Sequence, residues 1–464
     1  MTASTALETD YLVIGAGASG MAFVDTLLTE SDSQIVMIDR RHAPGGHWLD
    51  AYPFARLHQP SACYGVNSMA LGSGGADLPG SDDGLLERAT AAEVCGYYDQ
   101  VMTHRFLPSG RVRFFPSCDY LGNRRFRSRL SGEEVGVTAR RKVVDATYLQ
   151  SEVPATTPPP FDVAPGPRVV PVGELVRLAE PPSGYMIIGA GKTAQDACVW
   201  LLGRGVPPDR IRWIRPRDPW LIPRRYIQPG PGSVTTFEGY ARQVEIAAEA
   251  GSGDELFAGL EEAGLLVRID SSVMPTTYKG ATVDSGELEL LRRIEDVVRL
   301  GHVRRIERDR VVLDGGSSPT DGDWIHVLCT ARGLNPAPAV PVFDGDVITL
   351  EVLRFGFIPF SAALTAYVEA NRHDDAEKNE LCRPIPMPDS AFDWIRTTLQ
   401  SVRAAYRWSK HGDIVAWMEQ ARLNVLAGLL AQAADPRVGG AFQRYVARAR
   451  EASEKLEALM GTDP

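Results

Sequence analysis

Glycines at two places in the chain have the spacing that proteins use to bind nucleotide phosphates. At the first place, an apolar run over 11–14 ends in Gly15-x-Gly17-x-x-Gly20, and a helical pattern follows over 18–29. The first glycine of such a turn permits a tight bend, the second lets the backbone approach a pyrophosphate, and the third lets the helix pack on the strand. Because a helix N-terminus attracts anions, this stretch predicts a dinucleotide site.

A carboxylate supports this prediction. The next apolar run, 34–38, ends at Asp39, nineteen residues after Gly20. A carboxylate at this point can accept hydrogen bonds from both hydroxyls of an adenosine ribose. The alternative, a solvated loop residue, stays open for Asp39.

The same glycine pattern returns in the middle of the chain. An apolar run over 185–188 leads into Gly189-x-Gly191-x-x-Ala194, and alanine is tolerated at the third position. Lys192 and Thr193 stand at the start of the predicted helix, where Lys192 either touches phosphate or points to solvent. This stretch predicts a second dinucleotide site.

The strand after the second motif ends in a base rather than an acid. It covers 211–214 and is followed by Arg215 and Arg217. A carboxylate there would repel the 2′-phosphate of NADP, whereas arginine can bind it with two hydrogen bonds. The second site is therefore predicted to prefer NADPH to NADH; the alternative is that both arginines form a solvated surface pair.

Composition limits the classes of function. The chain has 464 residues and a formal net charge of −10, which argues against general nucleic-acid binding and against binding to an anionic membrane surface. It holds six cysteines, none in a C-x-x-C pair, so neither a zinc site nor a local dithiol is predicted, and no metal site is expected. We find no signal-peptide pattern and no apolar window of membrane-spanning length, and we expect a cytoplasmic protein.

A segment after Asp39 carries a family resemblance. The stretches Gly45-Gly46-His47-Trp48 and Tyr52-Pro53-x-x-Arg56, placed after a glycine motif and an acidic strand end, resemble those of flavin-containing and Baeyer–Villiger monooxygenases. The resemblance implies that the segment runs past the pyrophosphate and ribityl chain of FAD to the flavin ring. It also implies an α/β fold of two Rossmann-like dinucleotide-binding domains, in which the FAD domain is interrupted by the NADPH domain and a helical C-terminal region follows.

Domain boundaries follow from this layout and from a proline-rich linker over 154–171. We expect an FAD domain over 1–155 and 325–390, an NADPH domain over 165–324, and a helical region over 391–464 that serves packing or oligomer contacts. Within them we expect a helix over 90–104 with a capping box, an antiparallel meander over 112–144, and a helix that starts with Ser361 as N-cap. The insert after Pro229, the turn over 59–68 and the C-terminal helices are expected to line a substrate pocket.

The motifs and the resemblance together assign residues to the cofactors. For FAD they are Gly15, Gly17, Ala18, Ser19, Gly20, Asp39, Arg40, Gly46, His47, Trp48, His58, Gln59, Val144, Ala146, Gly333, Phe360 and Ser361. For NADPH they are Gly189, Gly191, Lys192, Thr193, Ala194, Arg215 and Arg217.

Three polar residues are candidates for catalysis. His58, with a pKa near neutrality, could bond a peroxide or relay a proton, Arg56 could balance negative charge, and Gln59 could complete the hydrogen-bond shell. The alternatives are structural: Arg56 bridging loop carbonyls and His58 as a satisfied core residue.

Two dinucleotide sites in one chain indicate hydride transfer from NADPH to FAD. Because no C-x-x-C pair is present, oxygen is the expected acceptor. We expect a monooxygenase, a monomer or homodimer, that oxygenates a small organic molecule with O2 through a C4a-(hydro)peroxyflavin. The stretch 169–175 lacks the histidine that the family carries, and His58 stands where Baeyer–Villiger enzymes have an aspartate, so the oxygenation subtype stays open. An electron-transferring flavin oxidoreductase, a flavin-dependent halogenase and a non-catalytic sensor are the alternatives.

Overall fold

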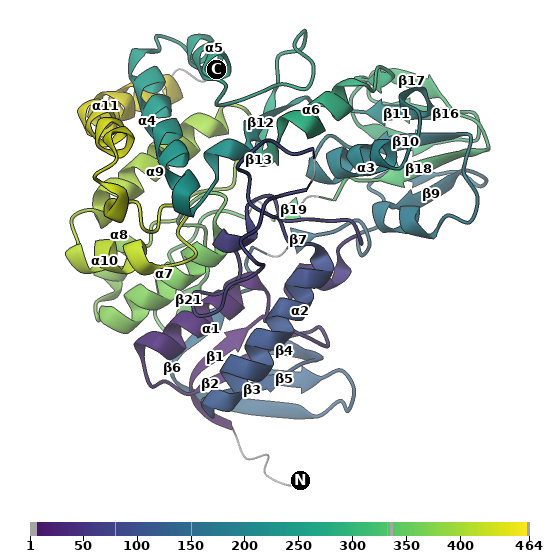
Figure 1. The fold of residues 1–464 in the computed structure, drawn as a ribbon. Helices are drawn as coiled ribbons and strands as arrows, with labels where there is room; N and C mark the ends of the chain where they lie inside the picture. Colours follow the sequence, from purple (N-terminus) through teal and green to yellow (C-terminus); the bar gives the residue numbers. More distant parts are fainter. Residues whose placement is uncertain (1–6, 79, 150, 332, 335–336, 462–464) are drawn as a thin grey trace.

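The structure is a computed structural model that describes residues 7–78, 80–149, 151–331, 333–334 and 337–461. It contains two sheets with mostly parallel strands and a helical region beside them (Figure 1). This arrangement confirms the predicted α/β class with two Rossmann-like units. Within the described part of the chain, no helix is long and apolar enough to cross a membrane.

The first sheet has the strand order β20-β21-β6-β1-β2-β3, and β4 and β5 extend from β6 as an antiparallel meander. Alternate residues of a strand face opposite sides of a sheet. Tyr11 and Val13 therefore pack with α1 (Ala18–Glu30), while Leu12 packs with Phe126 of the meander. The strands are β1 (Leu7–Ile14), β2 (Ile35–Ile38), β3 (Val112–Phe115), β4 (Cys118–Gly122), β5 (Arg125–Ser128), β6 (Glu134–Asp145), β20 (Phe343–Asp344) and β21 (Val347–Thr349).

The meander over 112–144 is only partly as predicted. β3 pairs in parallel with β2 and is the edge strand of the main sheet, and only β4, β5 and the first part of β6 are antiparallel. A strand as short as β3 carries no sequence signal for the direction of its partner, which the long-range chain path decides.

The predicted helix and capping box are confirmed in α2 (Ala91–Val101), where Thr90 and Glu93 cap each other.

The second sheet repeats the arrangement of the first. Its strand order is β14-β11-β10-β18-β9, all parallel. The helices α3 (Lys192–Gly203) and α6 (Ser285–Arg292) pack on one face, and the β15–β16 hairpin packs on the other. The strands are β9 (Arg168–Pro171), β10 (Gly184–Ile188), β11 (Ile211–Ile214), β14 (Val297–Val298), β15 (Val303–Ile306), β16 (Arg310–Leu313) and β18 (Trp324–Leu328). β18 pairs in parallel with β10, so the strand Trp324–Leu328 belongs to this second sheet.

Further short strands lie outside the two main sheets. They are β7 (Ser151–Glu152) paired with β19 (Gly333–Leu334), β12 (Pro219–Pro223) paired with β13 (Thr277–Val283), and β8 (Asp162–Val163) and β17 (Gly316–Pro319), which join the β15–β16 hairpin.

The C-terminal helices share a core with the insert of the second domain. α4 and α5 pack with α9 and α11 around Trp220 and Trp394, to the left of the two sheets in Figure 1. The helices are α1 (Ala18–Glu30), α3 (Lys192–Gly203), α4 (Ser233–Glu249), α5 (Gly253–Glu262), α6 (Ser285–Arg292), α7 (Ile358–Asn371), α8 (Asp375–Leu381), α9 (Asp393–Trp408), α10 (Gly412–Gln420) and α11 (Pro436–Met460).

The start of α7 differs from the prediction. The helix begins at Ile358 with Phe357 as its N-cap, and Ser361 lies in its first turn rather than before it. Pro359 suits the first turn of a helix, because its missing amide hydrogen has no partner there in any case. The Ser361 hydroxyl accepts hydrogen bonds from the backbone amides of Leu353 and Arg354 at 3.0 and 3.1 Å, so it fixes the preceding loop.

Candidate active site

The first glycine turn has the geometry that its sequence predicts. Gly15 has a φ of +103°, which favours glycine. A Cβ on Gly20 would lie 2.0 Å from the carbonyl oxygen of Gly15, so only glycine fits where α1 approaches the end of β1. Gly17 is the N-cap of α1 and gives no side-chain cap, which leaves the first amides of the helix for another acceptor.

The Gly45-Gly46 segment lies directly on this turn. Gly45 donates its amide hydrogen to the carbonyl of Ala16 at 2.9 Å, and a Cβ on Gly46 would come within 2.9 Å of the Cα of Gly17. Ala146, after β6, donates its amide to Ile14 at 3.0 Å beside the same turn. The structure thus brings together the glycine turn, the Gly-Gly segment and the end of β6, as the sequence predicted.

Asp39 is buried at the end of β2. Its two carboxylate oxygens accept hydrogen bonds from the amides of Ala16 and Arg41 at 2.6 and 2.7 Å, and its side chain is 6% exposed. It is therefore not a solvated loop residue. It holds the glycine turn, and each of its oxygens keeps a lone pair for a further donor.

The residues that the sequence predicts for FAD lie in several parts of the structure. Gly15 to Gly20, Asp39, Gly46, Val144 and Ala146 gather at the carboxyl ends of β1, β2 and β6. Trp48 donates its indole N–H to Tyr64 at 2.7 Å, and His47 lies beside it with a pKa that burial lowers to about 4. Arg40 is exposed, Phe360 is buried in the first core, and Gly333 lies in β19 with a φ of +70°.

The second glycine turn is more open than the first. Gly189 has a φ of +129°, and a Cβ there would lie 2.8 Å from the carbonyl oxygen of Cys329. A Cβ on Gly191 would meet no atom of the described residues within 4 Å. Gly191 is the N-cap of α3 and gives no side-chain cap, so the first amides of this helix have no side-chain acceptor from the cap residue.

Lys192 neither points to solvent nor stands free. Its ammonium group lies 2.6 Å from Asp196 and 3.7 Å from Glu287, and its side chain is largely buried. Tyr52, from the segment that resembles the monooxygenases, donates its hydroxyl to Asp196 at 2.6 Å. The first domain therefore contacts the start of α3 directly.

Arg215 is buried at the end of β11. One nitrogen, Nη2, lies 2.9 Å from Oδ1 of Asp218. The guanidinium carbon lies over the ring of Trp213, 4.8 Å from the ring centre. Its Nε and Nη1 are buried and have no hydrogen-bond partner in the part of the chain that the structure describes. The alternative of a solvated surface pair is wrong for Arg215, and two of its donors remain unsatisfied.

A cavity of about 570 Å³ lies beside Arg215. Arg299, just after β14, lines it as well and binds Asp218 at 2.9 Å and Asp270 at 2.7 Å. Two arginines thus stand at neighbouring strand ends of one parallel sheet. Arg217 is not with them, because it pairs with Asp389 at 2.9 Å.

Two of the three catalytic candidates donate hydrogen bonds to backbone carbonyls. Arg56 donates to the carbonyl of Arg88 at 2.8 Å, and Gln59 donates to the carbonyl of Cys63 at 2.9 Å. Polar side chains in loops commonly satisfy carbonyls in this way. Arg56 thus has the kind of loop contact that the structural alternative describes, and Gln59 holds the turn that follows it.

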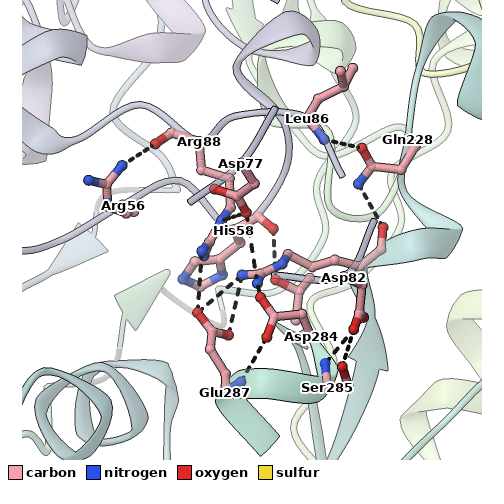
Figure 2. Close-up of polar contacts among 12 residues, drawn as sticks. Arg56, His58, Asp77, Asp82, Leu86, Arg88, Gln228, Asp284, Ser285 and Glu287 are labelled. Atoms are coloured by element: carbon pink, nitrogen blue, oxygen red, sulfur yellow. Dashed lines mark hydrogen bonds and ion pairs between the residues drawn. The ribbon is translucent and has the colours of Figure 1, made fainter. Parts of the chain in front are cut away.

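The side chain of His58 is accessible, but protein groups lie close to it, among them Arg88 and Glu287 (Figure 2). Burial and the charge of Lys192 lower its pKa to about 4, with a smaller contribution from Arg88, while Asp196 and Glu287 act in the opposite direction. The expected pKa near neutrality is wrong. At neutral pH the ring is uncharged and can donate or accept one hydrogen bond at each nitrogen, but it is not a proton donor of the imidazolium type.

A buried ionic cluster surrounds His58. Arg88 binds Asp77 at 2.9 Å and Glu287 at 3.3 Å, and Arg224 binds Glu287 at 3.2 Å and also Asp284 (Figure 2). Although burial raises the pKa of Glu287, the charges of Lys192, Arg224 and Arg88 outweigh it and lower this pKa to about 2. The cluster ties the loop of the first domain to β13 and α6 of the second and fixes the surroundings of His58.

The C-terminal region also contributes to the site, beyond packing or oligomer contacts. Arg422 donates to the carbonyls of Ala62, Tyr64 and Val66 at 2.6, 2.7 and 3.1 Å. It therefore clamps the turn that follows His58. Sequence reasoning missed Arg422, Arg299 and Glu287, since no local spacing marks a residue whose partners lie in other segments of the chain.

Comparison with known proteins places the chain in a family. It is 50% identical over 456 residues to the protein Rv2000 of Mycobacterium tuberculosis and to Mb2023 of Mycobacterium bovis, both named as uncharacterized, with 97% of this chain and 84% of each relative covered. The chain belongs to the family of these mycobacterial proteins. No protein-family model matches it.

Solved structures with a similar arrangement are flavin monooxygenases. They include a steroid monooxygenase bound to NADP (TM-score 0.49, 16% identity, 78% of this chain and 85% of that one) and a closed form of cyclohexanone monooxygenase (TM-score 0.48, 14% identity, 93% and 98%). A flavin-containing monooxygenase from Stenotrophomonas maltophilia has a TM-score of 0.42 at 16% identity, with 79% and 98% covered. At these identities and TM-scores, the likeness assigns neither an activity nor a cofactor to this chain.

Proposed function

We propose that the protein is an NADPH-dependent, FAD-containing monooxygenase that oxygenates a small organic molecule with O2. The observation that carries the proposal is the pair of glycine turns at the carboxyl ends of two parallel sheets, with Asp39 after the second strand of one and Arg215 after the second strand of the other. Open parallel sheets bind ligands at this end of the strands.

The residues at the first turn fit FAD. The uncapped amides of α1 suit a pyrophosphate, and Asp39 keeps lone pairs for ribose hydroxyls. Gly46 crosses Gly17 so closely that only glycine fits, which leaves both backbones able to face a bound diphosphate.

The residues at the second turn fit NADPH. Gly191 faces open space that a side chain would fill, and the unpartnered donors of Arg215 lie beside a cavity that Arg299 also lines. Two guanidinium groups at one cavity suit a phosphate monoester, the group that distinguishes NADPH from NADH.

When bound, the two cofactors supply hydride transfer and the activation of oxygen by reduced flavin. The chain's own residues position and shield that chemistry. His58 offers an uncharged hydrogen-bonding ring between the two turns, and the cluster of Arg88, Arg224 and Glu287 holds its surroundings rigid. Burial raises the pKa of all six cysteine thiols, which is the opposite of what a redox-active thiol needs, and this favours oxygen over a disulfide as acceptor.

The proposal is tested with the purified protein loaded with FAD, a panel of amines, sulfides and ketones, NADPH and air. We expect at least one substrate to gain one oxygen atom by mass spectrometry with matching NADPH consumption. If the loaded protein oxidises NADPH and delivers all electrons to an artificial acceptor or to peroxide for every compound, the electron-transferring oxidoreductase is the better description.

A further inference from the structure

The cavity beside Arg215 is lined by an acid as well as by arginines. Asp270, in the loop between α5 and β13, lines it together with Arg215 and Arg299. Oδ2 of Asp270 accepts a hydrogen bond from Nη2 of Arg299 at 2.7 Å. A phosphate group that enters this cavity therefore meets a guanidinium that already binds an acid.

Two acids bind Arg299, and they differ in burial. Asp218 is 7% exposed and lies between two arginines, with Nη2 of Arg215 and Nε of Arg299 each 2.9 Å from its carboxylate oxygens. The side chain of Asp270 is 33% exposed, and Arg299 is its one ion-pair partner among the described residues. Because water reaches Asp270, separating it from Arg299 costs far less than separating Asp218. Asp218 is thus a fixed counter-ion, and Asp270 is a displaceable one.

The two acids also use different edges of the Arg299 guanidinium. Nε and Nη2 donate to Asp218 at 2.9 and 3.3 Å, so this edge is occupied by the buried acid. The other edge consists of Nη1 and Nη2, and Asp270 binds its Nη2. Arginine binds a phosphate most strongly through two parallel N–H groups of one edge. Such binding to Arg299 requires Asp270 to release Nη2.

The loop holds Asp270 in place through contacts that such a release does not touch. Its Oδ1 accepts hydrogen bonds from the amide and the hydroxyl of Ser272 at 3.0 and 2.6 Å, and Arg292 donates to the carbonyl of Ile269 at 2.9 Å. The hydrogen bonds from Ser272, with the charge of Arg299, lower the pKa of Asp270 to about 2. The carboxylate therefore stays ionised beside the cavity at neutral pH.

From this geometry we infer that Asp270 is a specificity-determining residue, which occupies Arg299 in the free protein and competes for it with the 2′-phosphate of NADPH. A phosphate monoester carries roughly −1.5 to −2 charges near neutral pH, so it displaces a single carboxylate, but the exchange weakens its binding. NADH has a hydroxyl at the same position and leaves the pair of Asp270 and Arg299 intact. Asp270 therefore narrows the preference for NADPH that Arg215 and Arg299 create.

This inference deepens the proposed function and rests on the second turn as the NADPH site. The test is titration calorimetry of the FAD-loaded full chain with adenosine 2′,5′-bisphosphate and adenosine 5′-monophosphate, which differ only in the 2′-phosphate. Asp270→Asn should tighten the binding of the bisphosphate about threefold to tenfold, as expected for a partly exposed ion pair, and should not tighten that of the monophosphate. Asp270→Ala should act in the same way.

Two further variants separate the contact with Arg299 from a general effect of charge. Asp296→Asn is the matched control, because Asp296 stands between the cavity-lining residues Glu295 and Val297 and is similarly exposed, but pairs with Arg212 at 2.8 Å. It should leave the affinity for both probes unchanged. In an Arg299→Gln background, Asp270→Asn should no longer tighten the binding of the bisphosphate. Asp218 keeps Arg215 as its partner there, so the fold should survive.

The inference is overturned if Asp270→Asn leaves the affinity for the bisphosphate unchanged, if the tightening persists in Arg299→Gln, or if Asp296→Asn reproduces it. A wild type that binds neither the bisphosphate nor NADP+ overturns the inference together with the NADPH site. Anaerobic reduction by NADPH is recorded on the same samples. Flavin that NADPH does not reduce, while the effect of Asp270→Asn on the bisphosphate holds, refutes the proposed function alone.

Discussion

The two glycine turns differ although their motifs are nearly the same. At the first turn, Gly17 is covered by Gly46 and Asp39 binds the turn with both oxygens. At the second, a Cβ on Gly191 would meet no described atom within 4 Å, and Arg215 keeps two unsatisfied donors. The motif therefore fixes the bend between strand and helix, whereas segments distant in the sequence decide what the bend offers a ligand.

Under the proposed function, this difference gives the two turns separate tasks. The first turn is closed by its own chain and held by a buried acid, as suits a cofactor that stays bound. The second is open and basic, as suits a cofactor that enters and leaves. Four changes test the comparison, and they are ordered by expected effect.

The largest effect is expected at the third position of the motif. Gly20→Ala places a Cβ 2.0 Å from a backbone oxygen, so we expect a loss of about 3 kcal/mol in the free energy of unfolding. The equivalent residue of the second turn is already Ala194, and Ala194→Gly should cost only about 1 kcal/mol. Urea unfolding followed by circular dichroism measures both. Equal effects of the two changes would show that the helices approach their strands alike.

The next effect concerns the charge at the second turn. Arg215→Gln should lower the preference for NADPH over NADH, measured as a ratio of kcat/KM values, by on the order of tenfold to a hundredfold. Asp218 keeps Arg299 as its partner, so the fold should survive. Arg217→Gln is the control and should leave the ratio unchanged, because Arg217 pairs with Asp389. If the ratio of kcat/KM for NADPH to that for NADH is unaltered in Arg215→Gln, the 2′-phosphate binds elsewhere.

A smaller effect is expected at Gly191. Gly191→Ala should weaken NADPH binding by about tenfold, or about 1.4 kcal/mol, because the methyl group enters the space beside the helix N-terminus. Thermal stability should not fall, since no described atom lies within 4 Å of that methyl group. Gly203→Ala, at the other end of α3 and equally unobstructed, is the control and should leave NADPH binding as it is. Titration calorimetry decides between these outcomes.

The smallest effect concerns pH. The pKa values of His47 and His58 are lowered to about 4 from an ordinary value of 6.5, so each ring binds its proton less readily in the folded than in the unfolded chain. Their contribution to stability is present above pH 6.5 and is lost as the pH falls from 6.5 to 4. The decline in Tm over this interval should be shallower in the double variant His47→Gln, His58→Gln. A decline of the same steepness would mean that other groups cause it.

Local pattern predicted the two sheets, because apolar runs followed by glycine turns specify strand, bend and helix within twenty residues. The roles of Arg56 and Gln59 were not predictable in the same way, since the carbonyls that they bind become their neighbours only when the loops fold. Asp39 and Arg215 were correctly placed at strand ends, but their burial depends on Ala16 and Trp213. Arg422 had no signal at all, because the carbonyls that it binds belong to Ala62, Tyr64 and Val66, far away in the sequence.

The direction of β3 and the start of α7 show the same limit. A strand of four residues pairs with whichever neighbour the chain path supplies, and here β2 lies beside it. Ser361 is a suitable N-cap by type, yet the loop before it needs the hydroxyl for the amides of Leu353 and Arg354. Residue type therefore indicated what a side chain can bind, and tertiary contacts selected the partner.

The central claim, that the first turn holds FAD and the second feeds it from NADPH, is tested most directly by anaerobic stopped-flow reduction of the FAD-loaded protein. We predict that NADPH bleaches the flavin absorbance band at a rate about tenfold or more above that of NADH, given the charged contacts available at Arg215 and Arg299. Protein that takes up no FAD, or bound flavin that NADPH does not reduce, contradicts the account.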